Sequence, residues 1–271
     1  MKTFEEITKK SYDFNPLSYK LDWRWQLLAE LYDKNFVKVQ DKTEQKIPKK
    51  LHQIWLGSTI PDEYKKWGDT WQQFNPDWEY KLWTDVNTGD VEIPHRDLFE
   101  SVKNYGQKSD ILRLHILDQF GGIYVDTDFE CLKSFDDLSY LNFLVSVGYP
   151  SKVELYNGLI GCIPNHPIIS RVLQELDLRM VLSSKGSKEI FDTTGGYFFT
   201  RCFFEVVKKY TEGVVAFPID YFFPFPNEKD FHLKVKNAKD YIQDCSYALH
   251  YWACSWMPNL KEKRYGLDSR R

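Results

Sequence analysis

Two pairs of charged residues stand out in the otherwise apolar segment from Lys108 to Leu132. Asp110 and Arg113 are three residues apart in a predicted helix, so they share one of its faces. Asp126 and Asp128 follow the β-prone run at 123–125, and their side chains point to one side if the strand continues through them. Open α/β sheets bind ligands at the carboxyl ends of their strands, so the sequence predicts a ligand site here.

Two carboxylates on one side of a strand repel each other unless a cation lies between them. A hard divalent cation that also binds a diphosphate is a suitable counter-ion. The D-x-D spacing alone is a weak signal, because about one such pair occurs by chance in a chain of this length. A turn whose aspartates cap the backbone remains an alternative. For Asp110 and Arg113 the alternative is an exposed ion pair of little energetic value.

Alternating strands and helices are predicted to position these residues. A buried strand at 51–57, a helix at 61–76 and a strand at 78–84 form a βαβ pattern, which indicates a sheet with a parallel component. A helix at 95–106 is followed by one at 109–120, with Ser109 as its N-cap and Gly121-Gly122 as its stop. A strand at 123–132 comes next. Downstream, we expect strands at 143–148, 155–162, 213–218 and 247–252, and helices at 167–182 and 196–210.

The bulk composition is that of a globular protein, with 271 residues, 42% hydrophobic and 28% charged. A net charge of −3 provides no field that would gather nucleic acid. The chain contains no G-x-S-x-G, P-loop or G-x-G-x-x-G motif, which leaves serine hydrolases, P-loop NTPases and ordinary dinucleotide enzymes unsupported. Most of the six histidines are expected to be satisfied core or surface residues.

The five cysteines are widely spaced and include no C-x-x-C, which favours reduced thiols over a zinc site or disulfides. The N-terminus has no apolar signal-peptide region, and no apolar run approaches the ~20 residues that span a bilayer. We therefore expect a cytoplasmic protein. The basic tail at 261–271 is either an ordinary solvated end or a segment that is weakly attracted to the inner face of an anionic membrane.

Five segments, taken in order, carry a family resemblance: LHQIWLG, SDILRLHILDQFGGIYVDTDFECL, YNGLIGCIPNHP, TTGGYFFT and HYWACSW. They resemble glycosyltransferase family 32, the DXD-containing sugar transferases, which include fungal initiating mannosyltransferases and bacterial capsular polysaccharide transferases. The family shares its core with the glucosyltransferase domains of large clostridial toxins. The resemblance covers roughly Ile47 to Trp256, and its most specific part is S-D-x-x-R followed by G-G-x-Y-x-D-x-D. It implies an α/β fold of the GT-A type, a Rossmann-like nucleotide-sugar-binding fold with a mixed central sheet flanked by helices.

The resemblance also implies donor-site roles for individual residues. Trp55 matches a tryptophan that stacks on the nucleotide base, and Asn157 matches an asparagine that lines the donor pocket. Asp110 and Arg113 match the pair that holds the hydroxyls of the donor sugar, with the arginine near the phosphate.

The metal and the diphosphate are assigned by the same resemblance. Asp126 contacts ribose and sugar directly or through the metal, and Asp128 ligates Mn²⁺ or Mg²⁺. The C-terminal segment closes over metal and diphosphate through His250, Ser255 and Trp256, with His250 as the third candidate ligand of the metal. Asp126, Asp128 and Arg113 are the expected catalytic residues, whereas Asp118 lies off their helix face and is expected to be solvated.

The resulting hypothesis is a metal-dependent, retaining transfer of a hexose from a UDP- or GDP-sugar to a glycan or lipid-linked acceptor. An alternative is a nucleotide-sugar or glycan binding protein with little turnover. A metal-dependent phosphodiesterase or nuclease would need more converging acidic or histidine ligands and a basic groove.

The predicted organisation is an N-terminal helical extension at 1–45, with its helix within 21–36, then a catalytic domain at 46–260 and the basic tail. One departure from the family concerns the acceptor side, because Thr194-Gly195-Gly196 replaces the usual Thr-Gly-Pro.

Overall fold

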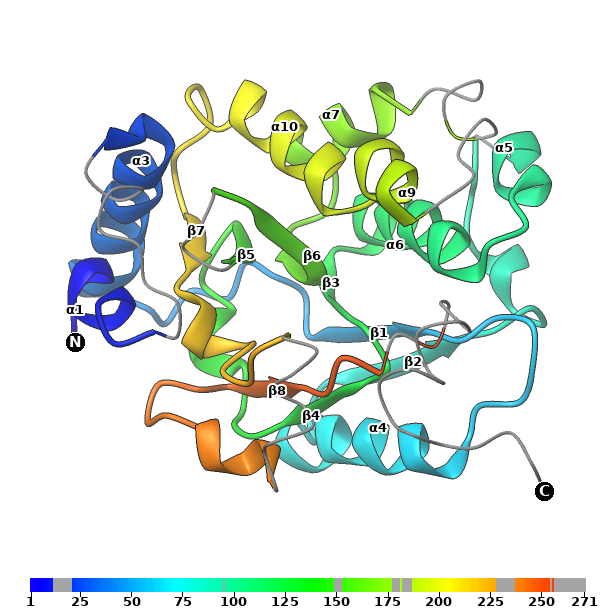
Figure 1. The fold of residues 1–271 in the computed structure, drawn as a ribbon, viewed down its shortest axis with the longest axis horizontal. Coiled ribbons are helices and arrows are strands. Elements are labelled where there is room, and N and C mark those ends of the chain that lie inside the picture. The colour runs from blue at the N-terminus through cyan, green and yellow to red at the C-terminus, as the bar shows by residue number, and fades with distance from the viewer. Residues whose placement is uncertain are drawn as a thin grey trace.

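The computed structural model describes residues 1–11, 21–94, 96–148, 153–176, 181, 187–227, 237–253 and 255. Its centre is a six-stranded sheet with the order β2-β1-β3-β6-β5-β7 (Figure 1). The strands are β1 Lys50–Ile54, β2 Glu79–Trp83, β3 Gly122–Val125, β5 Phe143–Val147, β6 Leu155–Cys162 and β7 Val214–Phe217. Strand β1 runs parallel to β2 and β3, and β5 runs parallel to β7, whereas β6 is antiparallel to both of its neighbours. The predicted mixed sheet is therefore confirmed.

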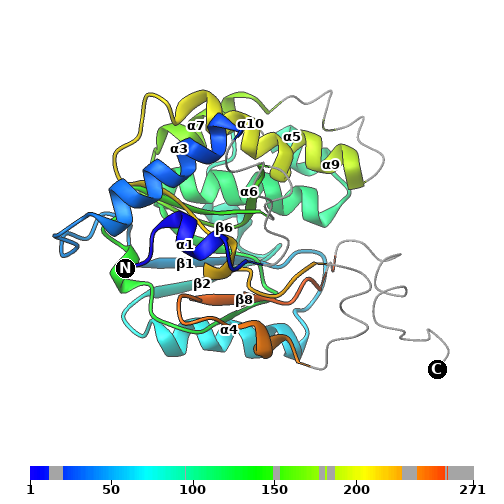
Figure 2. The same cartoon turned by 60° about the vertical axis from the view of Figure 1, so that its left-hand side comes forward.

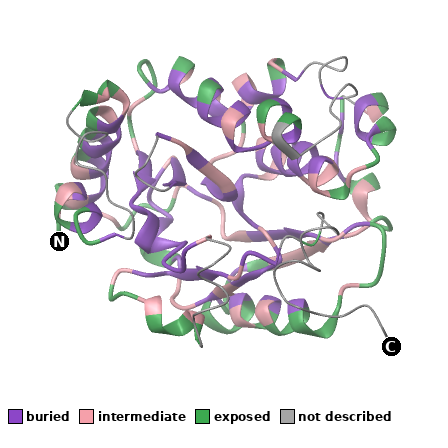
Figure 3. Ribbon diagram, viewed as in Figure 1, coloured by how far each residue is buried: buried purple, intermediate pink, exposed green. Residues whose placement is uncertain are grey.

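Helices cover the sheet on both sides (Figures 1 and 2). One side carries α5 Arg96–Ser101, α6 Tyr105–Phe120, α7 Pro167–Gln174, α9 Ser187–Thr193 and α10 Gly196–Val206. The other side carries α4 Asp62–Phe74 and a small antiparallel sheet of β4 Phe129–Cys131 and β8 Ala248–His250. Short 3₁₀ turns lie at Thr88–Asp90, Asp136–Leu138, Ile219–Tyr221 and Ala238–Tyr241. Figure 3 shows the central strands buried and the helices exposed on their outward faces.

The N-terminal segment packs against the β7 edge of the sheet (Figure 1). It consists of α1 Phe4–Thr8 and α3 Trp23–Tyr32, which continues into a π-helical turn at Asp33–Val37. The Tyr32 hydroxyl lies 2.6 Å from that of Tyr221, and the Phe36 ring lies edge-on to Phe217 with 4.9 Å between centroids. Asn35 donates to the carbonyls of Thr211 and Val214. This segment shares its core with β7, and the predicted boundaries at 45 and 260 stay predictions.

Helix α6 begins earlier than predicted. Its N-cap is Asn104, whose side-chain oxygen accepts from the Gln107 amide at 3.0 Å, so Ser109 lies inside the helix. An asparagine caps a helix as well as a serine does, and spacing alone did not separate the two. The predicted helix at 95–106 ends at Ser101.

The predicted strand at 123–132 is broken at the D-x-D. Strand β3 ends at Val125, a turn follows, and β4 then pairs with β8 in the second sheet. Gly121, the C-cap of α6, and Gly122, the first residue of β3, have φ of 60° and 87°, and a Cβ on Gly122 would lie 2.5 Å from the Lys50 carbonyl oxygen. The glycine pair therefore lets α6 turn tightly into β3 beside β1. Asp126 and Asp128 lie on a turn, not on a continuing strand.

Three other features differ from or complete the sequence prediction. Helices α7 and α10 are shorter than predicted, and α1 and α9 were not predicted. The four cysteines within the described residues are free thiols, as expected, and Cys254 lies outside that set. Among the described residues, no helix combines the length and the apolar character needed to cross a membrane.

Candidate active site

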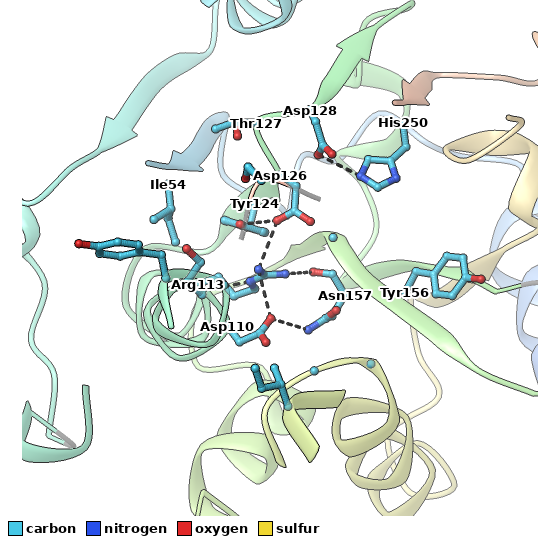
Figure 4. A pocket seen from close by; sticks show the side chains of 18 of the residues that line it. Ile54, Asp110, Arg113, Tyr124, Asp126, Thr127, Asp128, Tyr156, Asn157 and His250 are labelled. Atoms are coloured by element: carbon cyan, nitrogen blue, oxygen red, sulfur yellow. Dashed lines mark hydrogen bonds and ion pairs between the residues drawn. The ribbon is translucent and has the colours of Figure 1, made fainter. Parts of the chain in front are cut away.

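A cavity of about 620 Å³ opens where β1 and β3 end (Figure 4). Its wall includes the loop after β1, the first turns of α6, the β3–β4 turn and the start of β6. The N-terminus of α10 and the segment from β8 onward complete it. The predicted ligand site at the carboxyl ends of the strands thus coincides with a cavity.

Asp110 and Arg113 form the floor of this cavity and are 8% and 5% exposed. The Arg113 guanidinium lies 3.2 Å from Asp110 Oδ1 and 3.2 Å from Asp126 Oδ1. It also donates to the Asn157 carbonyl at 2.6 Å and lies 4.4 Å from the centre of the Tyr124 ring. The alternative of an exposed ion pair is therefore wrong, because both side chains are buried and both contact residues of other elements.

Asp110 is held by further hydrogen bonds from two elements. Asn157 Nδ2 donates to its Oδ1 at 3.1 Å, and Thr194 Oγ1 donates to its Oδ2 at 3.1 Å. Strand β6 and the segment before α10 therefore meet at this carboxylate (Figure 4). The predicted donor residue Asn157 thus lies directly against the predicted sugar-holding pair.

Asp126 lies at the centre of the site (Figure 4). Its Oδ1 accepts from the Tyr124 hydroxyl at 2.6 Å, and its backbone amide donates to the Gly158 carbonyl at 2.8 Å. Gln53 of β1 donates to its carbonyl at 3.2 Å. A Cβ on Gly158 would lie only 2.7 Å from Asp126 Oδ2, so the glycine makes room for the carboxylate. The turn is thus fixed by β1, β3 and β6 together.

Asp128 faces His250 across the β4–β8 pair. His250 Nε2 lies 2.9 Å from Asp128 Oδ1, and the Ala253 amide donates to Oδ2 at 2.8 Å. The backbone-capping alternative is thus partly correct for Asp128. One potential ligand atom from each of Asp126, Asp128 and His250 lies within 4.8 Å of the other two. Within the described part of the chain, His250 Nδ1 is buried and has no hydrogen-bond partner.

The electrostatics of the three carboxylates differ. Burial raises the pKa of Asp110 to about 6, although Arg113 opposes the shift. Burial also raises the pKa of Asp126, against the lowering effect of Arg113. For Asp128 burial acts in the same sense, but His250 and the Ala253 amide outweigh it and the pKa is lowered. Burial therefore destabilises the ionised forms of Asp110 and Asp126, and the positive charge of a bound cation would stabilise them.

Two of the remaining predicted residues, Trp55 and Ser255, line the cavity. Trp55 is half-buried on the rim, where its ring centroid lies 4.6 Å from that of Tyr64 and its Nε1 donates to Ser58 Oγ at 3.2 Å. Ser255 is exposed and lines the cavity, whereas Trp256 lies outside the described residues. Asp118 points elsewhere, as expected, but it is half-buried and accepts from Ser170 Oγ at 3.2 Å rather than being solvated.

Two other histidines have structural roles, as expected. His52 accepts from Trp83 Nε1 at 3.2 Å and contacts the Gly121 carbonyl at 3.1 Å through Nε2. His166 caps α7 by accepting from the Ile168 amide.

Sequence reasoning missed several residues of the cavity wall. Tyr124 was visible in the G-G-x-Y-x-D-x-D run and could have been singled out by its place two residues before Asp126. Tyr105, Glu154, Tyr156 and Trp252 also line the cavity. Tyr156 and Trp252 stand in the segments YNGLIGCIPNHP and HYWACSW but were not singled out there, and no local pattern marked the other two.

Comparisons with known proteins agree with this geometry. Residues 61–143 match the family described as "Glycosyltransferase sugar-binding region containing DXD motif". An uncharacterised glycosyltransferase, L373, of Acanthamoeba polyphaga mimivirus is 28% identical over 229 residues, which cover 79% of this chain and 86% of that protein. The mannosyl phosphorylinositol ceramide synthase SUR1 of Saccharomyces cerevisiae is 32% identical over 136 residues, 49% of this chain but only 35% of that protein.

Among solved structures, the one titled PaToxG glycosyltransferase superposes with a TM-score of 0.53 at 22% identity, covering 71% of this chain and 78% of that one. At this identity the likeness shows the fold, and the fold is that of a glycosyltransferase domain. The family match over 61–143, the relatives and the superposition together show that the chain is similar to DXD-containing glycosyltransferases.

Proposed function

We propose that the protein is a metal-dependent, retaining transferase that moves a hexose from a UDP- or GDP-sugar to a glycan or lipid-linked acceptor. The observation that carries this proposal is the double membership of Asp126. Its carboxylate belongs to the buried Asp110–Arg113 group on one side and to the Asp128–His250 group on the other. A sugar held by the first group and a diphosphate at the second would meet at this residue.

The group of Asp126, Asp128 and His250 fits a divalent cation. Two carboxylates and one imidazole come within 4.8 Å of each other, and among the described residues the buried His250 Nδ1 has no hydrogen-bond partner, which supports this assignment. An imidazole among the ligands favours a transition metal such as Mn²⁺ over Mg²⁺, which takes oxygen ligands. When bound, the cation would neutralise charge that develops on the leaving diphosphate.

The protein's own residues would bind and orient the donor. The Trp55 ring would stack on the base. Asp110 would accept hydrogen bonds from sugar hydroxyls, and the Asn157 amide would donate hydrogen bonds to them. Arg113 would supply a fixed positive charge beside the bond that breaks, held in place by four acceptor oxygens and the Tyr124 ring. Such preorganised groups need no rearrangement as charge develops.

Retention of configuration means that the acceptor attacks from the face the diphosphate leaves. A bond then forms between the acceptor oxygen and the anomeric carbon, the sugar–phosphate bond breaks, and the acceptor proton passes to the leaving phosphate oxygen. No separate general base is required in such a step.

The names of two sets of relatives support a lipid-linked acceptor and a mannose donor. They are mannosyl phosphorylinositol ceramide synthase of budding yeast and the inositol phosphoceramide mannosyltransferases of Schizosaccharomyces pombe. The chain spans little more than a third of each of those proteins, so their substrates enter here as proposals. We also propose a cytoplasmic location with peripheral membrane contact and no nucleic-acid partner.

The test is metal-stimulated hydrolysis of a panel of UDP- and GDP-sugars, followed by Asp128→Asn. Loss of one buried ligand charge should lower hydrolysis by roughly 10²–10³-fold while circular dichroism stays unchanged. Asp77→Asn, an exposed aspartate away from the cavity, is the matched control and should keep wild-type rates. Wild-type turnover in Asp128→Asn would contradict the metal role. A wild-type chain that binds a nucleotide sugar and never cleaves it would be a binding protein instead.

A further inference from the structure

We propose that Trp67 of α4 is a positioning residue that makes the binding of the nucleoside and the binding of the metal ion cooperative. Trp67 would do so by holding the base platform Trp55 and the segment 250–253, which carries the candidate metal ligand His250, in one arrangement. This inference rests on the proposed function, because that function assigns the base to Trp55 and the metal to the group of His250. It adds a coupling that does not depend on the charge of the diphosphate.

A row of four aromatic rings runs from the cavity rim to the segment 250–253. The ring centroid of Trp55 lies 4.6 Å from that of Tyr64, and the Tyr64 centroid lies 5.2 Å from that of Trp67. The Trp67 ring stacks on Tyr251, with 4.6 Å between centroids and 13° between the ring planes. Tyr251 directly follows His250 in the chain. Consecutive ring contacts therefore join the base platform to the neighbour of a candidate metal ligand.

Helix α4 holds Trp67 at a fixed position against the second sheet (Figure 1). One turn after Trp67, the fully buried Trp71 donates its Nε1–H to the Phe129 carbonyl at 3.0 Å. The Cys131 amide donates to Thr70 Oγ1 at 2.9 Å. These two bonds fix α4 to the first and last residues of β4, which directly follows the D-x-D turn. The position of Trp67 is thus set relative to the metal-binding turn.

Tyr251 is held between α4 and β4. Its backbone amide donates to the Asp128 carbonyl at 2.9 Å, and its hydroxyl donates to Glu130 Oε2 at 2.5 Å. Its ring lies against Trp67, so three contacts restrict this residue. A metal ion held by Asp128 and His250 would restrict the same stretch of backbone. Metal binding and the stacking of Tyr251 on Trp67 would therefore stabilise each other.

Packing of the core does not by itself explain this row of rings. Trp55, Trp67 and Tyr251 are half-buried. Among the described residues, the cluster that forms the main hydrophobic core includes Trp71 but neither Tyr64 nor Trp67. A partly exposed ring gains less from burial than a core ring does. The row is better explained by the two sites at its ends.

The coupling has a direction and a size. A metal ion that fixes the segment 250–253 orders Tyr251, and the rings then hold Trp55 where it stacks on the base. A nucleoside that finds these rings already ordered loses less conformational entropy on binding. By thermodynamic linkage, each ligand raises the affinity of the other by the same factor. The energy of one aromatic pair sets this factor at about 2–10-fold.

The test measures Mn²⁺ affinity by electron paramagnetic resonance of the free ion, with and without saturating uridine or guanosine. A nucleoside has no phosphate charge to attract the metal. We expect one of the two to raise Mn²⁺ affinity about 2–10-fold in the wild type, and Trp67→Leu to lower that factor to about one. Trp67→Phe keeps a ring and should keep most of the factor. Phe74→Leu, an exposed aromatic at the other end of α4, is the matched control and should keep all of it.

A second variant guards against a simple loss of folding. Tyr251→Leu removes the other ring of the stack, so it should lose the same factor, and the double variant should lose no more, because both substitutions remove one contact. If Trp67→Leu melts well below the wild type, Tyr251→Leu alone decides.

Two results would overturn the inference. One is a wild-type protein whose Mn²⁺ affinity is the same with and without either nucleoside. The other is a folded Trp67→Leu protein that keeps the wild-type factor. The proposed function is tested separately, because failure to hydrolyse any UDP- or GDP-sugar would contradict it. A nucleoside effect on Mn²⁺ affinity that requires Trp67 would still support the coupling in that case.

Discussion

Gly158→Ala tests whether the position of the Asp126 carboxylate governs the activity. The added Cβ would lie 2.7 Å from Asp126 Oδ2, and ordinary carbon–oxygen contacts are about 3.3–3.6 Å. The carboxylate must therefore move by roughly 0.6–0.9 Å. Its other oxygen is bonded to Tyr124 at 2.6 Å and lies 3.2 Å from Arg113, so any movement weakens these contacts as well.

A displacement of nearly 1 Å at a reacting centre costs about 10²-fold in rate. We therefore expect Gly158→Ala to lower kcat/KM for donor hydrolysis about 100-fold and to weaken Mn²⁺ binding measured by calorimetry. Gly89→Ala is a matched control, because no atom lies within 4 Å of a Cβ at that exposed position. It should behave as wild type in both assays.

The result that would refute this reasoning is a folded Gly158→Ala protein, with a wild-type melting temperature, that keeps wild-type Mn²⁺ affinity and kcat/KM. Such a result would mean either that the added Cβ does not displace the carboxylate or that the carboxylate has no part in the reaction.

Three further predictions address other parts of the site and the core. Trp55→Ala should weaken binding of UDP or GDP by about 1–3 kcal/mol in calorimetry, and equal affinity would remove Trp55 from the base site. The pKa of Asp110 is raised to about 6, so kcat/KM should fall as pH drops below that value, because the protonated acid no longer accepts from sugar hydroxyls. The pH profile of Asp110→Asn should lack this acidic decrease. Burial lowers the pKa of His52 to about 4, below its value in the unfolded chain. As pH falls from 6.5 to 4, the unfolded state therefore binds the proton first, and the free energy of unfolding should decrease by up to about 1.4 kcal/mol per pH unit. His52→Asn should show a shallower slope in urea titrations, and an unaltered slope would mean that other groups cause it.

Local patterns in the sequence predicted an α/β fold whose sheet has a parallel component, and the family resemblance added the mixed sheet and the roles of Asn157 and His250. The two charged pairs followed from local patterns, because a helix stop at Gly121-Gly122, then a β-prone run and two aspartates, brings α6 and β3 to one edge of a sheet. The turn at the D-x-D was not predictable in this way. Strand β3 ends because β4 pairs with β8, and β8 lies more than a hundred residues further along the chain.

The residues that sequence reasoning missed depend on similar long-range contacts. Gly158 matters only because Asp126 lies against it, and Trp252 matters only because its ring meets those of His250 and Tyr156. Both stand in segments that carry the family resemblance, but nothing in their own spacing distinguished them from their neighbours. Glycine and tryptophan are also ordinary residues of a buried strand and an aromatic-rich core, so their types did not mark them.

The charges of the site explain why its two halves belong together. Asp110, Asp126 and Asp128 carry −3 when ionised and Arg113 carries +1, so the group has a charge of −2 with His250 neutral. Burial makes that excess costly, as the raised pKa values of Asp110 and Asp126 show. A divalent cation brings this charge to zero, and the negative charge that a diphosphate adds would then be attracted by the cation and by Arg113. Metal and donor should therefore bind cooperatively, each raising the affinity of the other by the same factor. Removing Arg113 should weaken donor binding more than metal binding.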